Sequence, residues 1–475
     1  MKLFNNIIIF GIVLMLSQLQ ACKKAVDLLP TDFINEDNVF QDVSDLEKGL
    51  YGVYSSFSGE NTMYVNALIS DEVKISSENG GQGAFDFYWQ YNAENGSANS
   101  GWTNFYLTIG NLNKVLASVD KVQTFNASET TLKEKIRGEL FALRAICHFE
   151  LLQRYAARFD PANTSAVGIP YTKTSDIGAR PSRNTIGEVL TEIENDLDAS
   201  LTKPVSNSPI KIGDAGEIRL SKSVIYGYKA RVALYKKDWA KAIEYANQCL
   251  DNSGKKTLAD RIFFSSIWQD EEFENNEILF KLRRTGGGVG GLWTTTSDNV
   301  YYEPSDKLKA LYNRTTDIRF ESYFKISDGE TDTALVYKFY NSTRGRNIVD
   351  VKLMRSAEMY LIIAEAYAES GDLTNAAQWY NDLRRARIDS YTDETFLNKE
   401  EAVVKILEER ARELCFEGFR FFDLKRKGLP ISRLSSDVLS TLWQNMSAND
   451  YRFLLPIPQA SIFANPNLNG NNPGY

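Results

Sequence analysis

The sequence predicts an all-α protein in which helical hairpins form a scaffold and long irregular segments are inserted between them. Apolar residues recur every three or four positions over several long segments, as on one face of a helix. Two segments, 233–247 and 367–381, share one helix–turn–helix pattern. Two other stretches, 58–101 and 252–350, lack this period and combine glycine with scattered aromatic residues.

The composition is that of an acidic globular protein. The chain has 475 residues, of which 43% are hydrophobic and 24% charged, and its formal net charge is −8. This apolar fraction excludes a disordered or collagen-like chain. The acidic balance argues against nucleic acid as the main partner, because phosphate binding needs a basic surface. His148 is the only histidine, which excludes His-rich zinc sites, and no motif surrounds it, so we expect a structural role.

The first residues predict an export signal. Lys2 precedes an uncharged apolar run, 7–16, which is too short to span a bilayer but suits the core of a signal peptide. The sequence Leu19-Gln20-Ala21-Cys22 then resembles a bacterial lipobox, with Gln20 in place of the usual small residue. We expect residues 1–21 to be removed and Cys22 to be lipidated, and the alternative is a plain secretory signal.

Behind this signal we expect a tethered single domain. Residues 22–38 are the lipidated tether, and residues 39–475 are the domain, with an N-terminal part of about 39–250 and a C-terminal part of about 251–475. No later segment is apolar enough to cross a membrane. The other cysteines, Cys147, Cys249 and Cys415, are odd in number and lie among apolar neighbours, so we expect buried free thiols.

Four helices are predicted ahead of the first hairpin. The longest carries apolar residues at helical spacing from Leu132 to Tyr155. The fourth begins at Thr185, and Glu188 three residues later completes a capping box. The predicted ranges are 38–57, 102–119, 128–157 and 185–201.

The two hairpins correspond position by position. Asp238 matches Asp372 in the turn, and Ala242 matches Ala376 where the two helices approach. This is the pattern of a tetratricopeptide-like helix pair. Because the copies are far apart in the sequence, a large insertion must interrupt the stack.

Six rings in the irregular stretches are candidates for ligand binding. Sugar rings stack their C–H faces on exposed aromatic planes, and their hydroxyls need polar side chains beside the rings. The alternative is that these rings only hold the loops in place. The predicted ligand contacts, rings and polar neighbours together, are Asp71, Tyr88, Trp89, Tyr91, Asn92, Trp293, Asp298, Asn299, Tyr301 and Tyr302.

The segment 408–423 contains many carboxylates. Glu409 and Glu413 share a helical face, as do Glu413 and Glu417. A glycosidase uses two carboxylates, but these lie one helical turn apart among arginines, so we expect an ion-pair network that locks this helix.

The glycine tract 286–291 matches the dinucleotide-binding pattern, but residues poor at forming helices follow it, so we expect a flexible loop presenting Trp293. The segment 328–332 lacks EF-hand spacing and is predicted to be a surface turn. We predict no catalytic residue, metal site or cofactor.

Several blocks along the chain resemble the SusD/RagB family of Bacteroidota outer-membrane lipoproteins. The block 409–426 is the most specific, and the resemblance covers nearly all of the mature chain. The other blocks are 137–151, 168–171, 229–239, 355–366 and 455–475. One departure is that Lys23 and Lys24, rather than acidic residues, follow Cys22.

The resemblance implies a lipid-anchored protein on the cell exterior that takes part in nutrient uptake. Such a protein binds oligosaccharides, or peptides in a minority of members, and covers a TonB-dependent transporter of the SusC type without doing covalent chemistry. We therefore predict reversible capture of an oligosaccharide. The alternatives are a peptide-capturing relative and a helical-repeat scaffold that binds only protein.

Overall fold

The computed structural model describes residues 39–176, 178–211, 217–271, 276–286, 289–294, 299–326 and 334–475. The predicted signal peptide and tether with Cys22, the segment 328–332 and Asp298 lie outside these ranges. None of the helices within them is long and apolar enough to cross a membrane.

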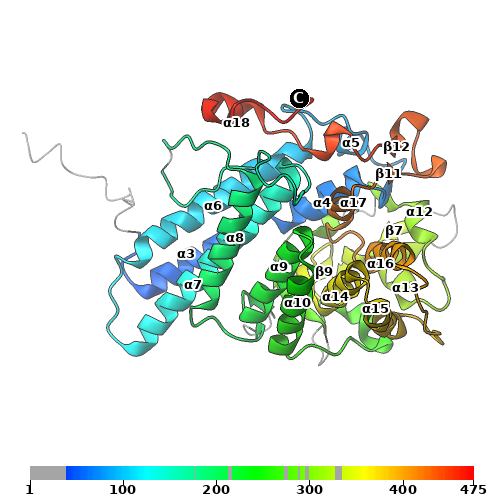
Figure 1. The fold of residues 1–475 in the computed structure, drawn as a ribbon, viewed down its shortest axis with the longest axis horizontal. Helices are drawn as coiled ribbons and strands as arrows, with labels where there is room; N and C mark the ends of the chain where they lie inside the picture. Colours follow the sequence, from blue (N-terminus) through cyan, green and yellow to red (C-terminus); the bar gives the residue numbers. More distant parts are fainter. Residues whose placement is uncertain are drawn as a thin grey trace, which may run out of the picture.

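The N-terminal helices pack side by side, at the left of Figure 1. They confirm the four predicted helices with ends shifted by a few residues. Asn126 caps α7 by accepting a hydrogen bond from the Glu129 N–H, and Thr185 and Glu188 form the predicted capping box of α8. The four helices are α3 (Val43–Ser56), α6 (Ser100–Val119), α7 (Ala127–Tyr155) and α8 (Ile186–Leu201).

Both predicted hairpins are confirmed. Asp238 and Asp372 cap the second helix of each pair by accepting a backbone N–H, and Ala242 and Ala376 are fully buried. Helix α10 packs against α14, so the two hairpins are neighbours despite the insertion between them (Figure 1). The helices concerned are α9 (Lys222–Tyr235), α10 (Trp239–Ser253), α14 (Ser356–Ser370), α15 (Leu373–Arg387) and, packed on α14, α16 (Lys399–Glu413).

The stretch 58–101 contains a helix that the sequence analysis missed. Most residues of α4 (Gly59–Ile69) are buried, including the polar Thr62 and Asn66. A helix covered on nearly all sides shows no one-sided apolar period, so its pattern could not predict it.

Short strands connect the two irregular stretches to each other and to the scaffold. Strand β1 (Val73–Ile75) pairs antiparallel with β5 (Tyr302–Pro304), which joins the first stretch to the second. Strand β4 (Ile278–Leu282) pairs antiparallel with β10 (Val351–Arg355), which leads directly into α14. One continuous hydrophobic core runs through both halves of the described chain.

The remaining elements are short. The helices are α5 (Ala84–Phe87), α11 (Phe264–Trp268), α12 (Asp306–Lys309), α13 (Ile318–Tyr323), α17 (Arg420–Lys427) and α18 (Gln459–Ala464). The strands are β2 (Ile210–Lys211), β3 (Glu217–Arg219), β6 (Phe324–Ile326), β7 (Ala334–Val336), β8 (Asn341–Ser342), β9 (Gly345–Arg346), β11 (Ile431–Ser432) and β12 (Asn445–Met446).

Close packing of α7 against the segment after α8 predicts the effect of a substitution at Gly138. A Cβ atom there would lie 2.7 Å from the Cβ of Lys203 and 2.7 Å from a methyl group of Val205. We expect Gly138→Val to lower the free energy of unfolding by about 1–3 kcal/mol, the usual cost of overpacking, in urea denaturation of the purified protein. A Cβ at Gly110 on α6 meets nothing within 4 Å, so Gly110→Val is the control and should change stability by less than about 0.5 kcal/mol. Equal losses in both variants would contradict the packing argument.

Candidate functional site

Three segments that are far apart in the sequence meet at one end of the molecule. We call residues 70–99, 299–309 and 431–453 together the loop junction. Besides the β1–β5 pair, the Ser305 hydroxyl donates to the Asp71 carbonyl at 2.7 Å, and the Asp306 N–H donates to the Asp437 carboxylate at 2.6 Å. In Figure 1, α5, β11, β12 and α12 lie together at the upper right. The junction is therefore a set of loops that a strand pair and hydrogen bonds hold together.

Asp71 holds this assembly together from the inside. Its carboxylate is buried and pairs with Arg420 at 2.7 Å and Lys307 at 2.7 Å. Burial alone would raise the pKa of Asp71, but the two cations overcome this effect and hold the pKa well below its ordinary value. The prediction that Asp71 contacts a ligand is corrected, because both its oxygens are engaged within the protein.

The pKa of Glu72 is shifted in the opposite direction to that of Asp71. Burial raises the pKa of Glu72 to about 8. The Phe416 N–H donates a hydrogen bond to its carboxylate at 3.0 Å, which lowers the pKa, and the negative charge of Asp71 raises it. The side chain is therefore neutral at pH 7. Two adjacent carboxyl groups with separated pKa values are typical of acid–base catalysis. Here both are at most 4% exposed, so neither reaches a bound substrate.

Four of the six predicted rings lie in the core rather than on a surface. Trp89, Tyr91, Trp293 and Tyr302 are each at most 3% exposed. A sugar needs an open ring face for stacking. The prediction that these four rings contact a ligand is therefore wrong. The physical reason is that loops of this length need an apolar core of their own, which these rings supply.

The contacts of the buried rings explain their placement. The Trp89 indole N–H donates to the Ile69 carbonyl at 2.8 Å, and the Arg433 guanidinium lies 4.2 Å from the ring. The Tyr91 hydroxyl donates to the Arg452 carbonyl at 2.6 Å, and that of Tyr302 donates to the Gln82 carbonyl. Trp293 packs between Tyr64 and Phe416, with ring centroids at 5.8 and 5.7 Å.

Two predicted rings, Tyr88 and Tyr301, are half-buried and keep part of their surface open. Tyr88 packs against Trp443, with ring centroids 5.3 Å apart, and Trp443 is also half-buried. Sequence reasoning missed Trp443. It lies in a third non-periodic segment, and its neighbours Gln444 and Asn445 are polar like those of the predicted rings, which is the signal that points to it.

The predicted amides at the junction are exposed. The Asn92 side-chain oxygen accepts hydrogen bonds from the N–H groups of Glu94 and Asn95, both at 2.9 Å, so it shapes its own turn. Asn299 is exposed beside Tyr301. The rings and amides of the loop junction that keep part of their surface exposed include Tyr88, Trp443, Tyr301, Asn92 and Asn299.

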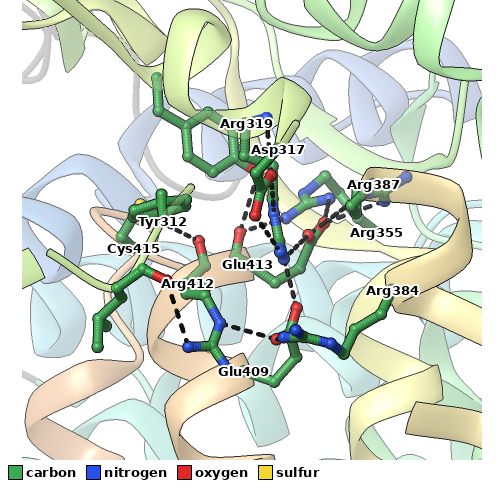
Figure 2. A network of polar contacts seen from close by, with 12 residues as sticks. Tyr312, Asp317, Arg319, Arg355, Arg384, Arg387, Glu409, Arg412, Glu413 and Cys415 are labelled. Carbon is green, nitrogen blue, oxygen red and sulfur yellow. Dashed lines mark hydrogen bonds and ion pairs between the residues drawn. The ribbon is translucent and has the colours of Figure 1, made fainter. Parts of the chain in front are cut away.

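The carboxylates of the segment 408–423 form the predicted ion-pair network (Figure 2). Glu413 receives guanidinium groups from Arg319, Arg355 and Arg387 at 3.1, 2.9 and 3.1 Å, and Glu409 pairs with Arg319 at 2.5 Å. Both glutamates are fully buried. The structural interpretation is confirmed, because no substrate can approach these groups without displacing the core.

The prediction that Glu413 and Glu417 share a helical face is wrong. Helix α16 ends at Glu413, and the chain then turns through Phe416 and Gly418, whose φ angles are 62° and 89°. Glu413 and Glu417 therefore do not share a helical face. They are brought together by Arg355, which pairs with both, at 2.9 and 2.7 Å.

The predictions for His148 and the three cysteines agree with the structure. His148 accepts the Thr172 N–H on Nε2 at 3.0 Å and donates from Nδ1 to the Arg144 carbonyl at 2.8 Å. Burial lowers its pKa to about 3, so the ring is neutral and structural. Cys147, Cys249 and Cys415 are buried free thiols. The second half of the glycine tract forms a 3-10 turn, Val289–Leu292, and the expectation that this loop presents Trp293 is wrong, because Trp293 is fully buried.

Comparison with known proteins identifies the family. Residues 206–475, more than half of the chain, match the model of the SusD family. The chain belongs to the SusD family. Residues 27–234 match a second SusD-like model, described as starch-binding associating with the outer membrane.

Individual SusD relatives match along nearly the whole chain. SusD-like protein P2 of Formosa agariphila is 24% identical over 505 residues, which cover 94% of this chain and 95% of that protein. The crystal structure of a candidate sugar-binding protein from Bacteroides vulgatus is 25% identical, with a TM-score of 0.79 and coverage of 92% of this chain and 99% of that chain. A SusD superfamily structure from Bacteroides thetaiotaomicron is 24% identical, also with a TM-score of 0.79, and covers 91% of this chain and 100% of its own.

The buried network predicts a large loss of stability in Glu413→Gln. The substitution leaves three buried guanidinium groups without their shared anion, and breaking a buried ion pair typically costs about 3–5 kcal/mol. We expect a loss of that size in urea denaturation. Glu408→Gln is the control, since the Glu408 side chain is 52% exposed and should contribute less than about 1 kcal/mol. A Glu413→Gln variant as stable as the control would contradict the structural role of the network.

The neutral state of Glu72 predicts a pH dependence of stability. Its folded pKa of about 8 lies above the unfolded value, so its contribution is fully present below about pH 4.3 and is lost as the pH rises toward 8. Glu72→Gln stays neutral and should remove this decline, measured as the difference from wild type between pH 5 and pH 9. Exposed Glu94→Gln is the control. A decline that persists in Glu72→Gln would show that Glu72 ionises normally.

Proposed function

We propose that this SusD-family protein captures oligosaccharides at the outer membrane and delivers them to a partner TonB-dependent transporter of the SusC type. In this proposal Cys22 carries the lipid anchor, residues 22–38 are the tether, and the single domain 39–475 faces the cell exterior. The protein binds and releases its cargo without changing it.

One observation carries the proposal. The half-buried rings of Tyr88 and Trp443 contact each other at the loop junction, whose segments also carry the half-buried Tyr301 and the exposed amides of Asn92 and Asn299. Neighbouring open rings with amides nearby are what a sugar chain needs for stacking and hydrogen bonding. The ion pairs of Asp71 below them support a fixed arrangement, which limits the entropy lost on binding.

Family membership supports the same class of ligand. The N-terminal half matches a model described as starch-binding, and one structural relative is a candidate sugar-binding protein. The carboxylates of Glu409 and Glu413 are bound in buried ion pairs, which favours a structural role for this segment over hydrolysis. Transfer to a transporter is favoured by weak contacts at an open surface, because a cargo must also be released.

Substitution of the open rings tests the site. After a glycan array has identified a ligand, we expect Tyr88→Ala and Trp443→Ala each to weaken binding about tenfold, which corresponds to about 1.4 kcal/mol. Isothermal titration measures the change. Leu439→Ala is the matched control, because Leu439 is an exposed apolar residue of the same segment without a ring.

Three other results would contradict parts of the proposal. Enrichment of peptides from a digest without glycan binding would make this a peptide-capturing relative. Recovery of a large β-barrel protein with no ligand of either kind would favour a scaffold that binds only protein. Release of shorter sugars during incubation with the bound glycan would contradict capture without chemistry.

A further inference from the structure

A hollow lies away from the loop junction, between α6 and the C-terminal segment. It has a volume of about 580 Å³, within the range of about 300–1,000 Å³ that is typical of small-molecule sites. We call it the α6 cavity. Helix α6 forms one wall, residues 170–176 with 179 and 181 form the second, and residues 461–468 form the third. None of its lining residues belongs to the loop junction.

A buried polar network fixes the second wall. The Asn113 amide is 2% exposed and donates to the carbonyls of Thr172 and Thr174, both at 3.2 Å. Arg144 donates to the Asn113 side-chain oxygen at 3.1 Å, and His148 accepts the Thr172 N–H. Loops of this kind are usually free at the surface, so a loop held by fully partnered buried groups is pre-organised.

The third wall is attached to the second by amides of the chain's end. Asn465 donates to the Pro181 carbonyl at 2.9 Å, and Asn467 donates to the Arg180 carbonyl at 2.6 Å. Figure 1 shows α18 lying across the top of α6 and α8. The cavity therefore keeps its shape through contacts that do not cross its open space.

The surface of the cavity suits an uncharged, hydroxyl-rich ligand. Tyr106 is half-buried with its ring 4.8 Å from that of Trp102, and Leu107 beside it is 60% exposed. The polar groups are the amide of Asn111 and the hydroxyls of Thr172, Thr174, Ser175 and Ser461.

Two of the charged groups of the lining, Lys173 and Asp176, are engaged within the protein. Lys173 pairs with Glu192 at 2.6 Å, and the Asp176 carboxylate accepts the Gly178 N–H at 2.8 Å. A charged ligand would have to compete with these contacts, whereas a neutral sugar would not.

We propose that the α6 cavity is a second binding site for a short neutral oligosaccharide. This site rests on the proposed function, since it extends glycan capture from the loop junction to a separate place on the same molecule. The Gln459 N–H donates to the Ala93 carbonyl at 3.0 Å, which connects the cavity's third wall to the loop junction.

Gly110 allows the cavity to be filled without disturbing the fold. It lies on the cavity side of α6, and a Cβ there meets nothing within 4 Å, so Gly110→Phe projects a ring into the open space. Thr103→Phe is the matched control, because Thr103 is exposed on the same helix and does not line the cavity. The probes are neutral hexa- and heptasaccharides of glucose, xylose and mannose, titrated calorimetrically into the purified full chain.

The decisive comparison uses the double variant Tyr88→Ala, Trp443→Ala, in which the loop junction is impaired. We expect this variant to retain binding of one probe, and adding Gly110→Phe to weaken that binding at least tenfold, whereas adding Thr103→Phe leaves it unchanged. Loss of all binding in the double variant alone, or retained binding after Gly110→Phe, would overturn the second site and leave the proposed function intact. If wild type binds none of the probes, the second site for a neutral oligosaccharide fails, whereas the proposed function fails only if the glycan array also gives no ligand.

Discussion

The pairing of Glu413 with three arginines is the interaction on which the arrangement of the C-terminal half depends. Arg319 comes from α13, Arg355 from the end of β10 and Arg387 from the end of α15, so one carboxylate joins three separate elements to α16. Arg387 also pairs with Glu277, just ahead of β4, at 2.9 Å. Buried charges are tolerable only when every partner is present. The insertion between the hairpins is therefore fixed to the scaffold at several points by buried ion pairs, because removing one partner would leave the other charge buried and unpaired.

The loop junction uses the same principle on a smaller scale. Asp71 anchors Arg420 and Lys307, while buried rings such as Trp89 and Trp293 fill the space behind the loops. Most aromatic residues of the irregular stretches are thus occupied in stabilising the loops. Those that remain half-open, Tyr88, Tyr301 and Trp443, can present faces to a ligand because their neighbours hold them in position.

The sequence predicted the parts of the fold that have a clear period. Helices α6 and α8 and the first half of α7 carry their buried apolar residues at helical spacing, and the hairpin turns repeat Asp238 at Asp372. It could not predict α4, which is buried on nearly every side, or strands such as β1 and β5, which are three residues long and pair across more than 200 positions. It identified the ion pairs of Glu409 and Glu413 from their spacing among arginines. It could not separate open from buried rings, because exposure of Trp89 or Tyr88 depends on segments that are distant in the chain.

The strand pair and hydrogen bonds that fix the ends of the loop-junction segments have a consequence for protein engineering. The strand pair β1–β5 and the bonds of Ser305 and Asp306 hold the ends of the loops, while residues 76–82 form hydrogen bonds with residues 300–302 of the same junction. Replacing residues 76–83 with a shorter or longer sequence should then leave the hairpins intact. A library of grafts at this position would offer a route to altered ligand preference on an unchanged frame.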